Sequence, residues 1–380
     1  MSRTSLKILH LHSSFQAGGK ELRAAKLMNA FGPEFEHTVV SAEIGALGAA
    51  SAIMPSIPVN FPANFPALAG APTPGRLQRI AKAMQGFDLV LSYNWGAMDA
   101  VMAHTIFAEA MRLPPLVHHE DGFNQDEVVK LKSSRNWYRR IALGRAQALV
   151  VPSERLEDIA ITVWHQPPSK VHRIVNGIPV LAYGKKARRD VLPRVIKHPG
   201  EMWLGTLAGL RAVKNLPRLV RAFAAMPEHW QLVILGEGPE REAIRTEAIR
   251  LSIGHRVHLP GFAADPAKVL GLFDLFALSS DSEQFPISVV EAMAAGLAVV
   301  SPRVGDVEMM ISVENRPYLS APGDEAGLAE ALGVLAANPA ERRLIGEANR
   351  KIARAEFDEA QMVMAYRAVY ARAMRRHSFP

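Results

Sequence analysis

Residues 279–296 read Ser-Ser-Asp-Ser-Glu-Gln-Phe-Pro-Ile-Ser-Val-Val-Glu-Ala-Met-Ala-Ala-Gly, a string that places two glutamates on either side of a predicted helix start. Pro286 suits a first helical turn, and Gly296 suits the position just after the last one. Glu283 is therefore expected in the loop before the helix and Glu291 one to two turns inside it. The free N–H groups of the first turn and the helix dipole form a site for an anion such as phosphate. One glutamate alone would indicate only an amphipathic helix, but the whole string favours a binding site.

Short apolar segments that suit buried strands alternate with helical segments along the chain. The expected strands are Leu6–His12, Thr38–Ala42, Leu89–Ser92, Leu116–His119, Ala148–Pro152 and Val171–Val175, followed by Met202–Leu207, Gln231–Leu235, Val257–Leu259, Leu275–Leu278, Ala298–Ser301 and Tyr318–Leu319. The expected helices include Glu21–Phe31, Arg76–Met84, Asn136–Gly144, Leu216–Ala225, Glu240–Leu251, Pro286–Ala295, Glu325–Ala337 and Glu359–Arg376. This alternation implies parallel sheets covered on both faces, so the predicted fold class is α/β with two doubly wound, Rossmann-like domains.

A segment rich in proline, glycine and basic residues separates the two halves. Residues 178–200 contain six Lys or Arg and one Asp and are expected to form the linker. The predicted domains are residues 1–180 and residues 181–358. Two such domains are expected to present the carboxyl ends of their strands to a shared cleft, where ligands of doubly wound sheets bind. The Pro- and Ala-rich stretch Met54–Pro74 is expected to be a loop.

The composition is that of a globular protein with an excess of positive charge. Of the 380 residues, 49% are hydrophobic and 21% charged, which suits two domains with their own cores. The net charge of +7 favours anionic partners, although background basicity would give the same value. The lack of cysteine excludes disulfides, thiolate metal sites and cysteine nucleophiles. Since no apolar leader and no apolar run of membrane length is found, the sequence predicts a cytoplasmic protein.

Two glycine pairs follow predicted strands. Gly18-Gly19 comes after the first strand, at the place where a phosphate-binding turn would fall. Gly236 and Gly238 belong to a similar turn in the second half. Neither turn has the G-x-G-x-x-G pattern, so a dehydrogenase is not favoured. For Gly236 we expect a close approach of two backbones, and for Gly19 either this or phosphate binding.

A basic loop follows the first strand of the second half. Arg211 and Lys214 are expected to project from it toward the cleft, where two cations could neutralise a diphosphate leaving group. The alternative is a pair of solvated basic residues. Asn215 is expected to cap the helix that follows.

One strand end in the first half carries several ionisable residues. Leu116–His119 is followed by Glu120 and Asp121, so a side chain there is expected to face the cleft. His10 and His12 share one face of the first strand, and for these we favour packing over metal binding. Asp281 and Glu283 alone are weak evidence for Mg²⁺. The sequence contains no Walker A, H-E-x-x-H or G-x-S-x-G motif.

Taken in order, these motifs resemble those of the family 4 glycosyltransferases, which retain the anomeric configuration and have the two-domain fold called GT-B. The motifs are Glu283-x7-Glu291 with Phe285-Pro286, the loop of Arg211 and Lys214, Gly236-Glu237-Gly238-Pro239 and Asn176-Gly177-Ile178. The resemblance covers nearly the whole chain and is strongest from Trp203 to Gly305. It implies that the C-terminal helix, residues 359–376, packs back on the first domain.

The resemblance also implies roles for individual residues. Glu291 would bind the nucleotide ribose, Glu283 would contact the donor sugar, and Arg211 and Lys214 would hold the diphosphate, which Gly19 would approach from the first domain. The predicted donor-binding residues are Gly18, Gly19, Arg211, Lys214, Gln284, Phe285, Pro286, Ile287, Ser288 and Glu291, and the predicted catalytic residues are Glu283, Asp121 and His119. No metal ion or other cofactor is expected, because members of the family generally need none.

The chain departs from the family pattern at three positions. Gln284 stands where many members have Gly. Gly209 stands where many have Arg, so Arg211 is the expected substitute. Asp121 stands where many have a His that touches the donor sugar, and either Asp121 or His119 is expected to take that role.

The implied function is transfer of a sugar, with retention, from a nucleotide-diphosphate sugar to a hydroxyl of a glycan or lipid-linked acceptor in cell-surface polysaccharide or glycolipid synthesis. Another GT-B enzyme, such as an epimerase or a phosphorylase, would need a pyridoxal-phosphate lysine motif or further carboxylates, and the sequence shows neither. A non-catalytic module that binds nucleotide sugars would have lost donor residues, yet Lys214, Glu283 and Glu291 are intact. Nucleic acid is not an expected partner, because the basic residues lack interleaved aromatics.

Residues 128–145 predict peripheral contact with an anionic membrane at its inner face. They contain Trp137, Tyr138 and no acidic residue, and their six basic residues are Lys130, Lys132, Arg135, Arg139, Arg140 and Arg145. Aromatic and basic residues combine in this way at membrane interfaces. At about 1 kcal/mol per basic residue, six could hold the protein there reversibly. The alternative is a solvated basic helix with packed aromatics.

Overall fold

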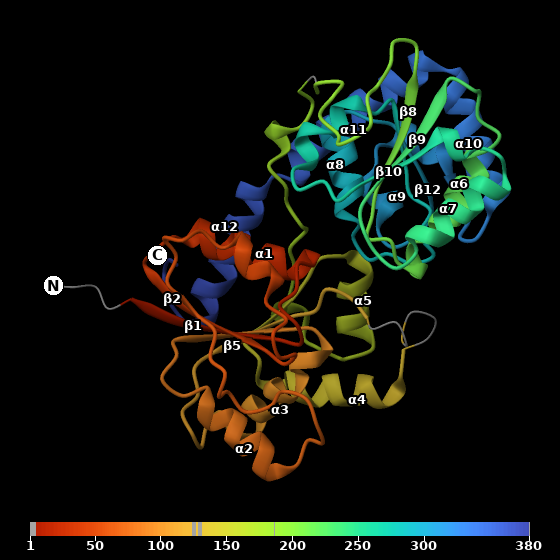
Figure 1. Ribbon diagram of the computed structural model, residues 1–380. Helices are drawn as coiled ribbons and strands as arrows, with labels where there is room; N and C mark the ends of the chain where they lie inside the picture. Colours follow the sequence, from red (N-terminus) through yellow and green to blue (C-terminus); the bar gives the residue numbers. More distant parts are fainter. Residues whose placement is uncertain (1–4, 124–126, 128–130, 186, 380) are drawn as a thin grey trace. The chain divides into compact units, whose positions relative to one another are not determined.

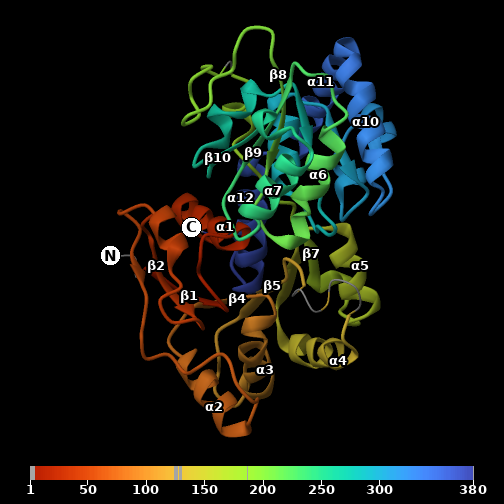
Figure 2. The same ribbon diagram turned by 45° about the vertical axis from the view of Figure 1, so that its right-hand side comes forward.

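The computed structural model describes residues 5–123, 127, 131–185 and 187–379. The chain forms two compact units, one made of Met1–Val175 with Met362–Pro380 and the other of Asn176–Gln361. Each unit contains one parallel sheet flanked by helices (Figures 1 and 2). The predicted α/β class with two doubly wound, Rossmann-like units is confirmed.

In the described part of the first unit, the sheet has seven strands, all parallel, in the order β3-β2-β1-β4-β5-β6-β7. These strands are β1 (Leu6–His12), β2 (Phe35–Ser41), β3 (Val59–Asn60), β4 (Leu89–Tyr93), β5 (Leu116–His119), β6 (Ala148–Val151) and β7 (Val171–Arg173). The strand order reverses between β1 and β4, and ligands of such sheets bind at the carboxyl ends near this point. The stretch 54–74, which we expected to be a loop, contains the short strand β3.

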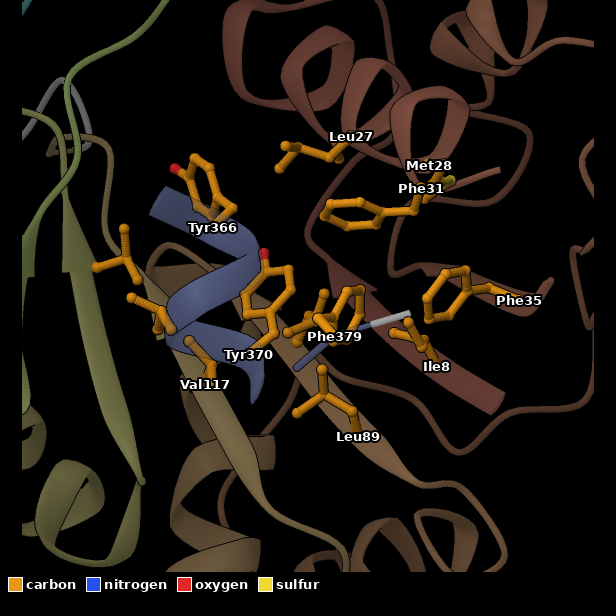
Figure 3. Close-up of a cluster of buried hydrophobic side chains, with 14 of the residues drawn as sticks. Ile8, Leu27, Met28, Phe31, Phe35, Leu89, Val117, Tyr366, Tyr370 and Phe379 are labelled. Carbon is orange, nitrogen blue, oxygen red and sulfur yellow. The ribbon is translucent and has the colours of Figure 1, made fainter. Parts of the chain in front are cut away.

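Helices cover both faces of the first sheet. The helices α1 (Gly19–Phe31) and α12 (Glu359–Ala373) pack on one face, and α2 (Pro74–Ala83), α3 (Met98–Phe107), α4 (Ser133–Ala142) and α5 (Glu154–Thr162) pack on the other. Figure 3 shows the core on the first face, where Phe31 of α1 and Tyr366 and Tyr370 of α12 lie among residues of the sheet. The ring centroids of Phe31 and Tyr370 are 6.0 Å apart. The end of the chain therefore shares one core with the first βα unit.

The sheet of the second unit has six parallel strands in the order β10-β9-β8-β11-β12-β13. These strands are β8 (Met202–Leu207), β9 (Trp230–Leu235), β10 (Val257–Gly261), β11 (Leu275–Ala277), β12 (Val299–Pro302) and β13 (Leu319–Ser320). On one face α6 (Leu216–Phe223) packs against α7 (Arg241–Arg250) and α10 (Glu325–Ala337), and on the other α8 (Ile287–Ala295) packs against α11 (Pro339–Glu356) (Figure 1). The order reverses between β8 and β11, so the loops after these strands adjoin the switch point.

Candidate functional site

The loops after β8 and β11 carry most of the predicted site residues of the second unit. The first leads through the single-turn helix η7 (Ala212–Lys214) into α6, and the second leads into α8. The two strands are parallel neighbours, so both loops leave the same edge of the sheet. The N–H of Asp281 donates to the carbonyl of Val213 at 2.9 Å, and Ser279 Oγ donates to the carbonyl of Lys214 at 2.9 Å. These bonds join the two loops.

Lys214 and Glu283 form an ion pair across the joined loops. Lys214 Nζ lies 2.5 Å from Glu283 Oε1, and Ser280 Oγ donates to the same oxygen at 2.6 Å. The side chains of Lys214 and Glu283 are only 16% and 10% exposed, so water screens their charges incompletely. An anionic ligand at this edge would meet a lysine whose position is already fixed.

Asn215 does not cap α6, which corrects the prediction. Its backbone is left-handed, with φ of 43°, and its side chain makes no cap hydrogen bond. The side-chain amide instead donates to the carboxylate of Asp281 at 3.2 and 3.3 Å. Arg218 Nη2 lies 2.7 Å from the same carboxylate. The polar residues of the two loops thus bind one another and support the Lys214–Glu283 pair.

The glycines after β9 bring their loop against the loop after β8. A Cβ added to Gly236 would lie 1.9 Å from the carbonyl oxygen of Ala208, and one added to Gly238 would lie 2.4 Å from that of Leu210. The close backbone approach predicted for Gly236 is confirmed. Arg211 follows on this loop with an exposed side chain, which takes part in no ion pair within the described part of the chain.

The N-terminus of α8 lies at the same strand edge. The helix begins at Ile287, one residue later than predicted, with Pro286 as its N-cap and no side-chain cap bond. The first-turn N–H groups and the helix dipole therefore favour an anion, and Ile287 and Ser288 are partly exposed there. Phe285 is buried against Phe357, with 5.7 Å between the ring centroids. As predicted, Gly296 ends the helix in the left-handed region, with φ of 81°.

Gly305 allows its loop to approach the backbone of Glu283 and Gln284 closely. A Cβ added to Gly305 would lie 2.5 Å from Gln284 O and 2.7 Å from Glu283 O, and the residue has φ of 55°. Asp306 N–H donates to Gln284 O at 3.0 Å. The side-chain oxygen of Gln284 is buried and has no hydrogen-bond partner among the described residues, so a ligand could supply one.

Glu291 lies at the start of the second turn of α8, where Tyr183 binds it. Tyr183 Oη donates to Glu291 Oε1 at 2.9 Å, from the position that follows the short helix η6 (Val180–Ala182). Tyr183 is buried, and this burial together with the charge of Glu291 raises the pKa of its phenol well above the ordinary value. The phenol therefore stays a donor at neutral pH and orients one oxygen of the carboxylate.

In the first unit, the turn after β1 forms the N-terminus of α1. Gly18 is the N-cap and Gly19 the first residue of the helix, and no side chain caps it. Glu21 is buried close by, since a Cβ added to Gly18 would lie 2.7 Å from its Oε2 atom, and Lys20 pairs with the same carboxylate. The turn thus places a helix N-terminus at the carboxyl end of β1.

Asp121 and His119 have different environments. His119 is fully buried, with Nδ1 donating to Ser92 O at 3.1 Å and Nε2 2.9 Å from Tyr370 Oη. Burial lowers the pKa of His119 to about 3, so its imidazole is neutral. Asp121 is partly exposed and binds both terminal nitrogens of Arg23. Of the two candidates, Asp121 is the residue that a ligand can reach.

The histidines of β1 are packed inside the first unit, as the sequence analysis favoured. His10 Nε2 lies 2.9 Å from His37 Nδ1, and the ring of His12 stacks on that of Tyr93 with 4.0 Å between centroids. Burial lowers the pKa of both His10 and His12 well below the ordinary value. In the described residues, no group of three His, Asp or Glu side chains is placed to hold a metal ion.

The basic segment predicted to face a membrane is only partly at the surface. Arg139 is fully buried, 3.2 Å from Glu120 and 3.3 Å from Glu127, and Arg135 lies 2.9 Å from Glu127. Glu120 and Glu127 precede residues 128–145 in the sequence, so the composition of that segment did not reveal these acidic partners. Lys130 lies outside the described residues.

An aromatic and basic surface nevertheless remains on α4. Trp137 is 61% exposed and Ile141, one turn further on, is 54% exposed. The guanidinium of Arg140 lies 5.1 Å from the centroid of the Trp137 ring. Lys132 and Arg145 are also exposed. We call Lys132, Trp137, Arg140, Ile141 and Arg145 the α4 surface.

Two residues that shape the site were absent from the prediction. Tyr183 lies in the segment expected to be a linker, where no pattern marks its bond to Glu291. For Arg23 the sequence did contain a possible signal. Asp121 stands at the position where many family members have a histidine, and a buried aspartate needs a nearby cation to stay ionised. That signal points to a cation but does not say which one.

Both halves of the chain match models of glycosyltransferase families. Residues 8–180 match the family model described as Glycosyltransferase Family 4, and residues 193–352 match the one described as Glycosyl transferases group 1. The chain is 26% identical over 279 residues to the N-acetyl-alpha-D-glucosaminyl L-malate synthase of Bacillus anthracis, covering 72% of this chain and 71% of that protein.

A second relative and a solved structure extend the comparison. The chain is 29% identical over 154 residues, 40% of each protein, to the N-acetylgalactosamine-N,N'-diacetylbacillosaminyl-diphospho-undecaprenol 4-alpha-N-acetylgalactosaminyltransferase of Campylobacter jejuni. The structure of Anabaena HepE in complex with UDP matches with a TM-score of 0.76 and 21% identity, covering 95% of this chain and 98% of that one. The sequence motifs, the two family matches and the fold agree, and the chain therefore belongs to the family 4 glycosyltransferases, with the GT-B fold.

Proposed function

We propose that this glycosyltransferase transfers a sugar from a nucleotide-diphosphate sugar to an acceptor hydroxyl and retains the anomeric configuration. The observation that carries the proposal is the arrangement at the carboxyl edge of the second sheet. There the Lys214–Glu283 pair and the oriented carboxylate of Glu291 accompany an uncapped helix N-terminus. Cations and N–H groups suit a diphosphate, and an oriented carboxylate suits the hydroxyls of a ribose.

In the proposed reaction the bond between the anomeric carbon and the diphosphate oxygen breaks while the acceptor oxygen bonds to the same face of that carbon. The acceptor proton passes to the leaving diphosphate, so no protein nucleophile is required. Lys214, Arg211 and the first turn of α8 stabilise the charge that develops on the leaving group. Glu283 contacts the donor sugar. Asp121, rather than the buried His119, is the proposed contact from the first unit.

A panel of donors tests this proposal. UDP-, GDP- and ADP-sugars are incubated with the protein, and slow hydrolysis is followed by proton NMR, which reports the anomer released first. We expect one donor to be hydrolysed to the anomer it carried, with unchanged rate in the presence of EDTA, because we propose charge neutralisation by Lys214 and Arg211. The UDP bound to HepE makes UDP-sugars the first choice. Release of the inverted anomer, or dependence on a metal, would contradict the proposal.

Removal of one oxygen tests the orientation of Glu291. In the Tyr183→Phe variant the phenol no longer donates to Glu291, and a net hydrogen bond is worth about 1 kcal/mol, so the Kd of the nucleoside diphosphate should rise about fivefold. Calorimetric titration measures this Kd. The matched control is Tyr318→Phe, which removes a hydroxyl 3.4 Å from Glu341 in the same unit and should leave the Kd unchanged. Equal affinities for all three proteins would contradict the role of Tyr183.

We further propose that the acceptor is lipid-linked or otherwise anionic and is reached at the cytoplasmic surface of a membrane. The diphospho-undecaprenol in the name of the Campylobacter jejuni relative and the α4 surface support this. Across the described ranges of the chain, no helix has both the length and the apolar character needed to span a bilayer. The attachment that we propose is peripheral and uses the α4 surface. The α4 surface has three exposed basic residues, and one of them, Arg145, pairs with Glu109 at 3.1 Å. At about 1 kcal/mol per basic residue, the attachment should be weaker than that expected from the six counted in the sequence.

Vesicle co-sedimentation tests this attachment. The protein should pellet with vesicles containing phosphatidylglycerol but not with phosphatidylcholine alone, and salt should release it. The double variant Lys132→Glu, Arg140→Glu should lose most of this binding. A charge-matched control, Arg343→Glu with Lys351→Glu on the exposed side of α11, should keep it. Salt-insensitive binding to both vesicles, or binding to neither, would contradict the proposal.

A further inference from the structure

Arg23 holds the carboxylate of Asp121 by two hydrogen bonds. Arg23 lies in the second turn of α1, and Asp121 follows the end of β5 by two residues. Nη1 and Nη2 of Arg23 donate to Oδ1 and Oδ2 of Asp121, the latter at 2.9 Å. The guanidinium also lies over the ring of Tyr366, 5.6 Å from its centroid. The N–H of Asp121 donates to Asn94 Oδ1 at 2.8 Å, so the backbone of Asp121 is fixed as well.

This pair is nearly buried, but its two members differ in exposure. The side chain of Arg23 is 5% exposed and that of Asp121 is 13% exposed. The carboxylate is therefore the member that a ligand can still reach. A bidentate guanidinium occupies one lone-pair position on each oxygen, and each oxygen keeps a second position for another donor.

Arg23 is the main group that keeps the pKa of Asp121 low. Burial alone would raise the pKa of Asp121, but the charge and hydrogen bonds of Arg23 hold it below its ordinary value. The other facing groups are Lys20 of α1, His119 of β5, Tyr93 of β4 and Tyr366 of α12. Lys20 is paired with Glu21, the pKa of His119 is lowered to about 3, and burial raises the pKa values of both tyrosines. Loss of Arg23 would remove the charge and hydrogen bonds that lower the pKa of Asp121 and leave burial, which raises it.

We infer that Arg23 is a positioning residue, which keeps Asp121 ionised and oriented so that its carboxylate accepts a hydrogen bond from a hydroxyl of the donor sugar. The inference rests on the proposed function, in which Asp121 contacts that sugar. A carboxylate that is nearly buried loses its charge unless a cation stays beside it. The substitution of aspartate for the family histidine is thus matched by an arginine on α1. A fixed acceptor also selects donors that carry a hydroxyl at the contacted position.

The test measures donor hydrolysis by the full-length protein as a function of pH. The probes are UDP-glucose, UDP-N-acetylglucosamine and GDP-mannose, and the one hydrolysed fastest by the wild type is used. Arg23→Gln is compared with wild type, with Asp121→Asn and with the double variant Arg23→Gln, Asp121→Asn. Binding of UDP and GDP alone is measured for every protein, because the proposed nucleotide contacts belong to the second unit.

The ratio of the Arg23→Gln rate to the wild-type rate should fall at least about tenfold from about pH 8 to about pH 5.5, because Asp121 becomes protonated as the pH falls. The same ratio for the double variant should be independent of pH, since its carboxylate is gone. Nucleotide affinity should be unchanged in all variants. A pH-independent ratio for Arg23→Gln, with active wild type, would overturn the role of Arg23 and leave the proposed function intact. Wild type that binds and hydrolyses none of the probes would overturn both.

A second substitution covers the case in which Arg23→Gln does not fold, as judged by circular dichroism. Arg23→Lys keeps the positive charge but cannot form the bidentate pair of hydrogen bonds with Asp121. Its rate should be about three- to tenfold below wild type at every pH, because Asp121 stays ionised but is less well oriented. A rate equal to that of wild type would overturn the positioning role.

Discussion

Replacement of Lys214 by alanine is expected to lower turnover with the true donor about a hundredfold. The substitution would remove the contact that we propose between Lys214 and the leaving diphosphate. Loss of one group that stabilises a developing oxyanion raises the activation barrier by about 3 kcal/mol. The fold should remain intact, because Ser280 still donates to Glu283 and the loops keep their other bonds. Steady-state kinetics and a thermal melt measure the two effects separately.

The matched control is Lys268→Ala in the same unit. Lys268 also pairs with a carboxylate, at 3.0 Å from Asp265, but it is 73% exposed and is not one of the proposed donor-binding residues. Its loss should leave turnover unchanged. If the Lys214→Ala variant kept full activity with a donor that the wild type uses, Lys214 would not stabilise the leaving group.

The Glu291→Ala variant should lose turnover by a similar factor, also with an intact fold. The substitution removes the carboxylate that we propose for the ribose and leaves the buried Tyr183 hydroxyl without its acceptor. Since the ribose is bound before and during the reaction, the Kd of the nucleoside diphosphate should rise as turnover falls. Calorimetry and steady-state kinetics check both effects.

Glu347→Ala is the control for this variant, because Glu347 is an exposed glutamate on the neighbouring helix α11. It should bind and turn over the donor as the wild type does. Wild-type affinity and activity in Glu291→Ala would show that α8 does not carry the nucleotide.

The bounds of three buried strands were predicted correctly. β1, β5 and β8 have the predicted bounds. Each of these strands contains two or more of Leu, Ile, Val, Met and Trp, which suit a strand buried in a parallel sheet. α3 was not predicted, because apolar residues occupy nearly all of its sides and leave no helical periodicity. β3 has two residues, too few for any pattern.

The sequence marks the positions of the candidate site residues but not the contacts between them. Glu283, Glu291 and Lys214 each lie within a few residues of a strand end or helix start, which the local sequence marks. Their partners are distant along the chain: Lys214 and Glu283 are 69 positions apart, and Tyr183 and Glu291 are 108 positions apart. Such contacts depend on the order of strands in the sheet, which local periodicity does not contain.

The same distance effect explains the error over the basic segment. The charge count for residues 128–145 includes Arg139 among the residues available to a membrane. Its acidic partners, Glu120 and Glu127, precede the segment and pair with it inside the first unit. Tertiary packing therefore decides which members of a basic run are available to a partner.

The most direct test of the proposed donor site is calorimetric titration of the wild-type protein with UDP, GDP and ADP, each alongside its nucleoside. We predict that one of the three diphosphates binds at one site per chain and at least about a hundredfold more tightly than its nucleoside, because in the proposed function Lys214, Arg211 and the first turn of α8 hold the phosphates. Absence of binding by all three diphosphates, or equal affinity of the diphosphate and its nucleoside, would contradict the account.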